Sequence, residues 1–226
     1  MGKVIKNMAL NKIKGIIFDL DGTLADTMGD LVVSMNEMLS QYGFPHRTRD
    51  ELLRFINGGA VNFVRSSLPD DRQSDEEFVL KAFETYNKAY TQHYIDTTYL
   101  YDGIYDTVMR LKSAGMKLAV LSNKQHFQTN AIIINLFITD AFDIVIGHSN
   151  LPHKPDPAAV NHILNRLDLT ADEVLFVGDS DVDIKTAINS GTYPVGVSWG
   201  YRSPELLIVT GAKKIIEKPI EILELI

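Results

Sequence analysis

Short runs of apolar residues recur along the sequence, and most of them lead directly into polar or charged residues. The runs are "GIIFDL" at 15–20, "KLAVLS" at 117–122, "DIVIG" at 143–147, "VLFVG" at 174–178 and "YPVGVS" at 193–198. They lack the polar alternation of a half-exposed strand, which indicates strands covered on both faces. Helical patterns lie between the later runs, so the sequence predicts an α/β fold with a doubly wound parallel sheet. Ligands of such sheets bind at the carboxyl ends of the strands.

The interval 27–100 has a different pattern, because it contains no convincing buried strand. Apolar residues within 31–42 recur at helical spacing, and Gly43 ends that pattern. Ser74 and Glu77 have the spacing of a capping box, which predicts the start of a second amphipathic helix. We therefore expect a helical insertion between the first and second strands of the sheet.

The length of 226 residues suits either one large domain or a core that carries a smaller insertion. The hydrophobic fraction of 45% is ordinary for a globular protein and allows a sizeable core. We predict a catalytic α/β core that comprises residues 13–26 and 101–226, and an all-helical cap domain over residues 27–100. The order of residues 1–12 is left open.

Net charge and cysteine content limit the classes of partner and site. The net charge of −7 argues against a general nucleic-acid or anionic-membrane surface. Because the chain has no cysteine, disulfides, thiolate metal sites and a cysteine nucleophile are excluded. The first dozen residues lack the apolar segment of a signal peptide or membrane span, so we expect a cytoplasmic protein. Monomer and homodimer both remain open.

Two clusters of aspartates follow predicted strands. Asp19 and Asp21 end the first strand in "FDLDGT", where period-two spacing lets both carboxyls project from one side. Asp179 and Asp183 follow a later strand in "VGDSDVD". Each cluster alone also suits a turn or a helix start, where acids complement the helix dipole. Together, carboxylates crowded at one sheet edge predict a hard divalent cation, and Mg²⁺ fits best.

Polar residues follow two further strands. The segment "LSNK" offers the hydroxyl of Ser122 and the turn amides at Asn123, which can hold the oxygens of an anion. In "HKP", Pro155 favours an extended conformation for Lys154. A lone loop lysine is usually a solvated charge. Strand ends that together carry a hydroxyl, a lysine and two acidic clusters nevertheless form a pattern that this base rate does not explain.

These motifs resemble those of the haloacid dehalogenase-like superfamily, specifically its phosphatase branch with a helical cap inserted after the first strand. The motifs "DLDGT", "LSN", "HKP" and "GDSDVD" appear in the family's order, and the resemblance covers nearly the whole chain from about residue 13 onward. Within the superfamily the chain is most similar to phosphoglycolate phosphatases. This similarity rests on "DGTLADT", "INGGAVNFV" and "VGVSWGYRSPELL". The resemblance implies Mg²⁺-dependent hydrolysis of phosphate monoesters of a small metabolite.

The resemblance also implies a role for each acidic residue. Asp19 would attack phosphorus and form an aspartyl-phosphate, and Asp21 would act as general acid and then general base. The Mg²⁺ ligands would be Asp19, the main-chain carbonyl of Asp21, Asp179 and Asp183, the last either directly or through a hydrogen bond. The phosphate-binding residues would be Ser122, Asn123 and Lys154, and the side chains of Ser122 and Lys154 would orient the phosphoryl group.

Other residues allow both a functional and a structural interpretation. The cap residues that would line the substrate, or form only a turn between helices, are Asn57, Gly58 and Gly59. Arg65 would either pair with a substrate carboxylate or lie solvated on the surface. His148 and His153 suit ordinary loop histidines better than a zinc site.

Two competing functions remain at this stage. A sugar-phosphate mutase of the same superfamily would retain both Asp19 and Asp21. A non-catalytic, receiver-like phosphoacceptor would also use acids and a lysine at strand ends. Asp21 favours turnover over a long-lived phosphoryl-enzyme, because an adjacent base promotes hydrolysis. A large helical insertion likewise suits a lid over a substrate, so the phosphatase is the preferred hypothesis.

Overall fold

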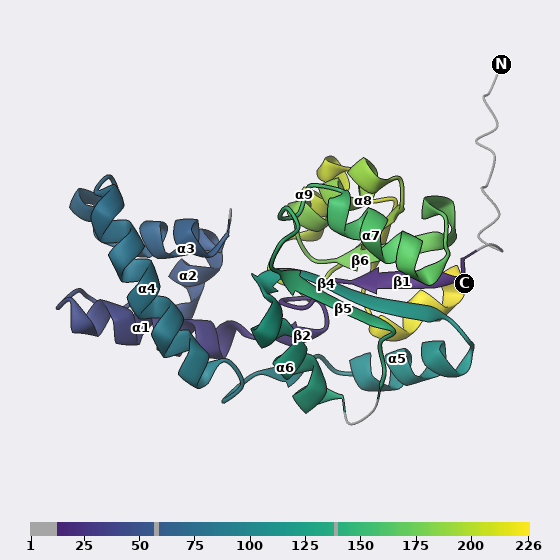
Figure 1. Ribbon diagram of the computed structural model, residues 1–226, viewed down its shortest axis with the longest axis horizontal. Helices are drawn as coiled ribbons and strands as arrows, with labels where there is room; N and C mark the ends of the chain where they lie inside the picture. Colours follow the sequence, from purple (N-terminus) through teal and green to yellow (C-terminus); the bar gives the residue numbers. More distant parts are fainter. Residues whose placement is uncertain (1–12, 57–58, 138–139) are drawn as a thin grey trace, which may run out of the picture.

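A six-stranded sheet forms the larger part of the computed structural model, which describes residues 13–56, 59–137 and 140–226. Its strand order is β5-β4-β1-β6-β7-β8, and all its neighbouring strands are parallel (Figure 1). The strands are β1 Gly15–Phe18, β4 Lys117–Gln125, β5 Ile144–His148, β6 Val174–Gly178, β7 Tyr193–Val197 and β8 Lys214–Ile216. The predicted α/β class with a parallel sheet is confirmed.

Helices cover both faces of this sheet. Figure 1 shows helices both below and above the sheet. Those below are α5 Ile104–Ser113 and α6 His126–Leu136, and those above are α7 Ala158–Leu167, α8 Asp181–Ser190 and α9 Pro204–Thr210. Ile16 joins the hydrophobic cluster that includes α5 and α6, whereas Ile17 joins the cluster that includes α7 and α8. Adjacent residues of β1 are therefore buried on opposite faces, which explains the absence of polar alternation.

The central position of β1 determines which strand ends lie together. β1 pairs with β4 on one side and with β6 on the other. The "VLFVG" strand, β6, is thus a direct neighbour of the first strand. The sheet also contains β8, which the sequence analysis did not predict because the segment has only three residues, one of them an exposed lysine.

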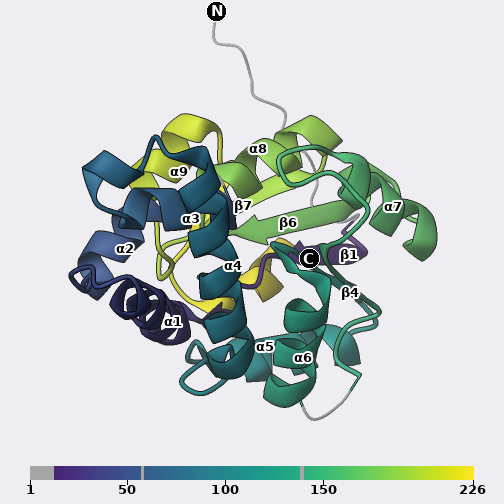
Figure 2. The same ribbon diagram turned by 60° about the vertical axis from the view of Figure 1, so that its left-hand side comes forward.

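A group of helices lies beyond the carboxyl ends of the strands (Figures 1 and 2). It consists of α1 Met28–Gln41, α2 Arg49–Phe55, α3 Ala60–Ser67 and α4 Glu76–His93. The strands β2 Ala25–Asp26 and β3 Tyr99–Leu100 pair antiparallel where the chain enters and leaves this group. The helices bury a hydrophobic cluster of their own, with Met35, Phe63 and Tyr86 among its members. This cluster supports our proposal that residues 27–100 form a cap domain.

The start of α4 differs from the expectation. Its N-cap is Asp75, whose side chain accepts a hydrogen bond from the Phe78 main chain, so the capping box predicted for Ser74 and Glu77 is wrong. A start at Glu76 places both Glu76 and Glu77 in the first turn, where their charges complement the helix dipole.

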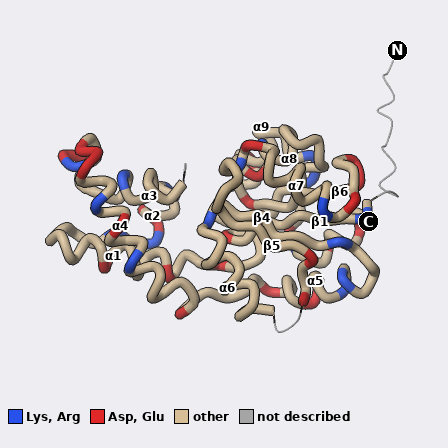
Figure 3. Tube along the Cα trace, viewed as in Figure 1, with Lys and Arg blue, Asp and Glu red and all other residues tan. Residues whose placement is uncertain are grey.

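Charged residues and apolar helices can be signs of a nucleic-acid or membrane partner. Within the described ranges, none of the helices combines the length and the apolar character needed to cross a bilayer. In Figure 3, Lys and Arg lie among Asp and Glu both in the helical group and around the sheet. The expected absence of nucleic-acid and membrane partners stays a prediction.

Candidate active site

Three buried carboxylates converge at the carboxyl ends of β1 and β6. Asp19 directly follows β1, Asp179 directly follows β6, and Asp183 lies in the first turn of α8. One carboxylate oxygen from each lies within 4.8 Å of the others. Asp19 is 7% exposed, Asp179 2% and Asp183 0%. Asp179 precedes the N-cap Ser180, so it approaches Asp183 through the strand-to-helix turn and not along one helical face.

Two glycines allow the main chain to pass close to Asp179. Gly22 has a φ of +83°, and a Cβ atom there would lie 2.3 Å from Asp179 Oδ2. A Cβ atom on Gly200 would lie 2.2 Å from the Cβ atom of Asp179. Only a residue without a side chain fits at either position, which keeps the Asp19–Asp21 turn next to the second acidic cluster.

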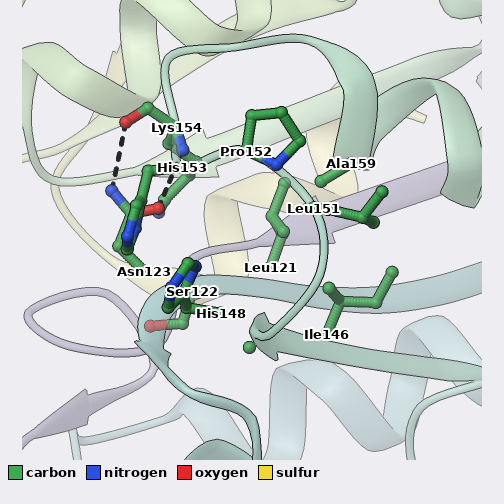
Figure 4. A pocket seen from close by; sticks show the side chains of 11 residues that line it. Leu121, Ser122, Asn123, Ile146, His148, Leu151, Pro152, His153, Lys154 and Ala159 are labelled. Atoms are coloured by element: carbon green, nitrogen blue, oxygen red, sulfur yellow. Dashed lines mark hydrogen bonds between the residues drawn. The ribbon is translucent and has the colours of Figure 1, made fainter.

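Lys154 lies among the same carboxylates. Its Nζ atom is 2.8 Å from Asp19 Oδ1 and 2.7 Å from Asp183 Oδ1, and its side chain is only 4% exposed. Figure 4 shows how Asn123 holds this lysine. The Lys154 main-chain N–H donates to Asn123 Oδ1 at 2.8 Å, and Asn123 Nδ2 donates to the Lys154 carbonyl at 3.1 Å. The side-chain amide of Asn123 is therefore committed to the main chain of Lys154.

The electrostatics of this cluster favour an additional cation. Burial raises the pKa of Asp19, and the neighbouring Asp183 raises it further. The same two causes raise the pKa of Asp179 to about 7. Burial alone would lower the pKa of the Lys154 ammonium, but Asp183 and Asp19 outweigh it and raise that pKa. Lys154 pairs with two of the three clustered acids, Asp19 and Asp183, so the cluster holds more acidic groups than cations.

The oxygen donors present fit a magnesium ion. Mg²⁺ prefers hard oxygen ligands, which these carboxylates supply within a short distance of one another. Thr23 Oγ1 and the Tyr201 main-chain N–H donate to Asp179 at 3.1 and 2.8 Å and fix its orientation. The main-chain N–H and hydroxyl of Ser180 fix Asp183 in the same way, at 3.0 and 2.6 Å. Oriented carboxylates are what a metal site requires.

Asp21 lies in a different environment from Asp19. Thr27 Oγ1 donates to Asp21 Oδ1 at 2.5 Å, and Ser122 Oγ donates to Asp21 Oδ2 at 3.4 Å. The ammonium of Lys124 donates to Asp21 Oδ1 as well. The carboxyl of Asp21 is thus surrounded by donors and is not one of the three clustered acids. Two aspartates two positions apart are therefore chemically distinct, one among acids and one among donors.

Lys124 is a site residue that the sequence analysis missed. Its side chain is 7% exposed, and its Nζ atom also lies 2.5 Å from the hydroxyl of Tyr90 on α4. Its main-chain N–H donates to Ser122 Oγ at 3.1 Å. The signal that would have found it is its position directly after "SN" at the end of a buried strand.

The two histidines near Lys154 pack against each other. The rings of His148 and His153 stack with centroids 3.6 Å apart and an angle of 16° between their planes. Stacked rings do not direct their nitrogen atoms at a common point, so the zinc interpretation gains no support. They line a pocket of about 10 Å³ beside Ser122, drawn in Figure 4.

The candidates in the helical group are less informative. Asn57 and Gly58 lie outside the described residues, and Gly59 is the N-cap of α3 with a φ of 87°. Arg65 forms an ion pair with Glu76 at 2.8 Å and donates to the Gln73 carbonyl. Its guanidinium is thus already engaged within the helical group, which weakens its assignment to a substrate carboxylate.

Known proteins are similar to this chain in sequence and in fold. Residues 16–197 match the family model described as haloacid dehalogenase-like hydrolase. The phosphoglycolate phosphatase of Neisseria gonorrhoeae is 32% identical over 204 residues, which cover 89% of this chain and 86% of that protein. The phosphoglycolate phosphatase of Vibrio cholerae is 32% identical over 201 residues, covering 87% and 89%. The crystal structure of a predicted phosphoglycolate phosphatase from Haemophilus somnus is 28% identical, with a TM-score of 0.86, and the match covers 94% of this chain and 97% of that chain.

Proposed function

Because this chain belongs to the haloacid dehalogenase-like hydrolase family, as the motifs of its sequence indicate, we propose that it hydrolyses phosphate monoesters of small metabolites. The observation that carries this proposal is the burial of Lys154 between Asp19 and Asp183, beside Asp179. A buried lysine among carboxylates at strand ends offers a nucleophile and a fixed positive charge in one place. That combination suits the transfer of a phosphoryl group to a carboxylate.

Asp19 would be the nucleophile. One of its carboxylate oxygens would form a bond to phosphorus while the bond from phosphorus to the leaving alcohol oxygen breaks, giving an aspartyl-phosphate. Lys154 Nζ, 2.8 Å from Asp19 Oδ1, lies where it would neutralise charge on the phosphoryl oxygens. Ser122 would donate to another of those oxygens. Asn123 would act as a positioning residue, because its side chain holds the main chain of Lys154.

Asp21 would move the protons. Because Asp21 lies outside the cluster of three acids, its carboxyl would be free to deliver a proton to the leaving oxygen. The same carboxylate would then accept a proton from the water that attacks the aspartyl-phosphate. Phosphate would leave and the free carboxylate of Asp19 would be restored. The hydrogen bond from Thr27, at 2.5 Å, would keep Asp21 oriented through both steps.

Asp19, the main-chain carbonyl of Asp21, Asp179 and Asp183 would hold the Mg²⁺ ion. When bound, the ion would supply positive charge beside the reacting phosphoryl group and offset repulsion between the carboxylates. Asp183 also accepts a hydrogen bond from Lys154, so its carboxylate would interact with both the lysine and the Mg²⁺ ion.

The substrate we propose is a short phosphate ester that carries a carboxylate, such as 2-phosphoglycolate. Support comes from the relatives, which are named phosphoglycolate phosphatases and which this chain matches over most of their length. We propose as well that the enzyme is cytoplasmic.

A substrate panel tests this function. Phosphate release is measured from 2-phosphoglycolate, p-nitrophenyl phosphate and hexose phosphates, with Mg²⁺ or with chelator, and with Asp19→Asn as the control. Release that requires Mg²⁺ and Asp19, with the highest kcat/KM for 2-phosphoglycolate, is the expected result. Formation of an isomeric sugar phosphate without release would favour a mutase. Stable phosphorylation of Asp19 without turnover would favour a phosphoacceptor.

A further inference from the structure

A second lysine, Lys124, lies beside Asp21 with its side chain 7% exposed, and the proposed mechanism gives it no role. Lys124 reaches from the end of β4 to helix α4, where its Nζ atom is 2.5 Å from the hydroxyl of Tyr90. It also donates to Asp21 Oδ1. The lysine thus connects the proposed acid with the helical group.

Lys124 and Lys154 differ in the charge that surrounds them. The Lys154 ammonium lies between two carboxylates, those of Asp19 and Asp183. The Lys124 ammonium faces one carboxylate, that of Asp21, and one neutral phenol, that of Tyr90. An ammonium has three protons to donate, and these two described partners accept two of them. A buried ammonium so placed can accept a further anionic partner.

The position of Lys124 relative to Asp21 identifies what that partner is. If Asp21 delivers the proton to the leaving oxygen, the leaving group lies against Asp21. Lys124 is in direct contact with Asp21 on the side of α4. An anionic group one or two carbons from the ester oxygen would therefore come within reach of Lys124 Nζ.

We propose that Lys124 recognises a carboxylate on the leaving part of the substrate and so determines specificity for short acidic phosphate esters. The inference rests on the proposed phosphatase function. It gives Lys124 the role that the sequence analysis considered for Arg65, whose guanidinium pairs with Glu76 at 2.8 Å.

Helix α4 completes this subsite. Tyr90 is 3% exposed and stacks on Tyr86 with centroids 5.9 Å apart and an angle of 8° between the planes. The Lys124 Nζ atom lies 4.9 Å from the centre of the Tyr90 ring. The fixed phenol thus limits where the ammonium can lie, and the substrate carboxylate would share that ammonium with it. A longer leaving group would carry its charge past this point and gain less from Lys124.

The test compares two esters of similar size, 2-phosphoglycolate and ethyl phosphate, in wild type and in Lys124→Gln. The measured quantity is the ratio of kcat/KM for the acidic ester to that for the neutral ester. Because the two rates come from the same sample, this ratio does not depend on the fraction of folded enzyme. We expect the ratio to fall about 10- to 100-fold, the effect of losing a charge-assisted hydrogen bond, mainly through a higher KM for the acidic ester.

Two further variants make the result specific. Lys124→Arg keeps the positive charge and should retain a higher ratio than Lys124→Gln. Lys112→Gln removes a lysine paired with Asp143 on another part of the core, and it should leave the ratio unchanged.

The possible outcomes separate this inference from the proposed function. If wild type hydrolyses both esters and the ratio in Lys124→Gln stays within about threefold of wild type, the role assigned to Lys124 is wrong while the phosphatase stands. If wild type releases phosphate from neither ester under any metal condition, the proposed function fails and this inference fails with it.

Discussion

The Nζ atom of Lys154 lies 2.8 Å from Oδ1 of Asp19, and both residues are buried. They come from distant parts of the chain, one from the turn after β1 and the other from the loop after β5. Without the Lys154 ammonium, the carboxylates of Asp19 and Asp183 would be buried with no cation beside them. The pairing of Lys154 with Asp19 links the stability of the core to the chemistry proposed for it.

Removal of Lys154 should therefore destabilise the protein. In chelator, Lys154→Met leaves the carboxylates of Asp19 and Asp183 buried without their cation, and we expect a loss of about 3–5 kcal/mol in the free energy of unfolding. Urea unfolding followed by circular dichroism measures this. The matched control is Lys185→Gln, which removes a half-exposed pair with Asp181 and should cost less than about 1 kcal/mol. Equal losses in the two variants would contradict the account.

Asp19→Asn should separate activity from folding. Turnover should fall by at least about 10³-fold, because an amide cannot take the place of the attacking carboxylate. Burial and Asp183 raise the pKa of Asp19, so its charge is unfavourable in the folded state without metal. The melting temperature of the variant in chelator should consequently equal or exceed that of wild type. Near-native activity would show that Asp19 is not the nucleophile.

Magnesium should stabilise the folded protein through the acidic cluster. At about 100 times its dissociation constant, a ligand that binds only the folded state adds about 2.7 kcal/mol. We expect a saturable rise in melting temperature with Mg²⁺ in wild type and a much smaller one in Asp179→Asn. Sodium chloride at matched ionic strength is the control. An undiminished rise in Asp179→Asn would remove Asp179 from the proposed ligands.

His93 should make the stability of the helical group depend on pH. Its ring bonds Asp96 at 2.8 Å and Glu37 of α1 at 3.2 Å, and these contacts raise its pKa above 6.5. A raised folded-state pKa means that the stabilisation is present at low pH and is lost as pH rises through the folded pKa. His93→Gln should be less stable than wild type at about pH 5 and similar to it at about pH 9. Chemical unfolding at both values checks this, and a loss of equal size at both would show that the contacts act without charge.

Asp30 should hold α1 to the segment before β3. Its buried carboxylate accepts from the main-chain N–H and the hydroxyl of both Thr97 and Thr98, at 2.5–3.1 Å. Asp30→Ala leaves these donors without their acceptor, and we expect a loss of roughly 2–4 kcal/mol in the free energy of unfolding. Asp30→Asn keeps one acceptor oxygen and should lie between wild type and Asp30→Ala. An alanine variant as stable as wild type would mean that water replaces the carboxylate.

The sheet was predictable because a strand buried on both faces, such as β1, has consecutive apolar residues in the sequence. Ile16 and Ile17 belong to opposite hydrophobic clusters, so both must be apolar. The N-cap of α4 was not predictable to the residue, since Ser74 and Asp75 both suit an N-cap and only the structure shows that Asp75 is used. Strand β8 was missed because three residues carry too little pattern.

The site was predictable where a residue ends a strand and carries a distinctive group. Asp19, Asp179 and Lys154 follow β1, β6 and β5, and the strand order brings them together. Lys124 was not found, because its partner Tyr90 is 34 positions away along the chain. The pairing of Arg65 with Glu76 was likewise hidden, since it depends on how α3 packs against α4.

The central claim is that Asp19 accepts the phosphoryl group, and acid quenching of Asp21→Asn during reaction with p-nitrophenyl phosphate tests it most directly. This leaving group needs little protonation, so attack by Asp19 proceeds, whereas hydrolysis of the intermediate lacks its general base. The account predicts a burst of nitrophenol and a mass gain of one phosphoryl group on the peptide that contains Asp19. Turnover with that peptide unmodified at every quench time, or a phosphoryl group on another residue, would contradict it.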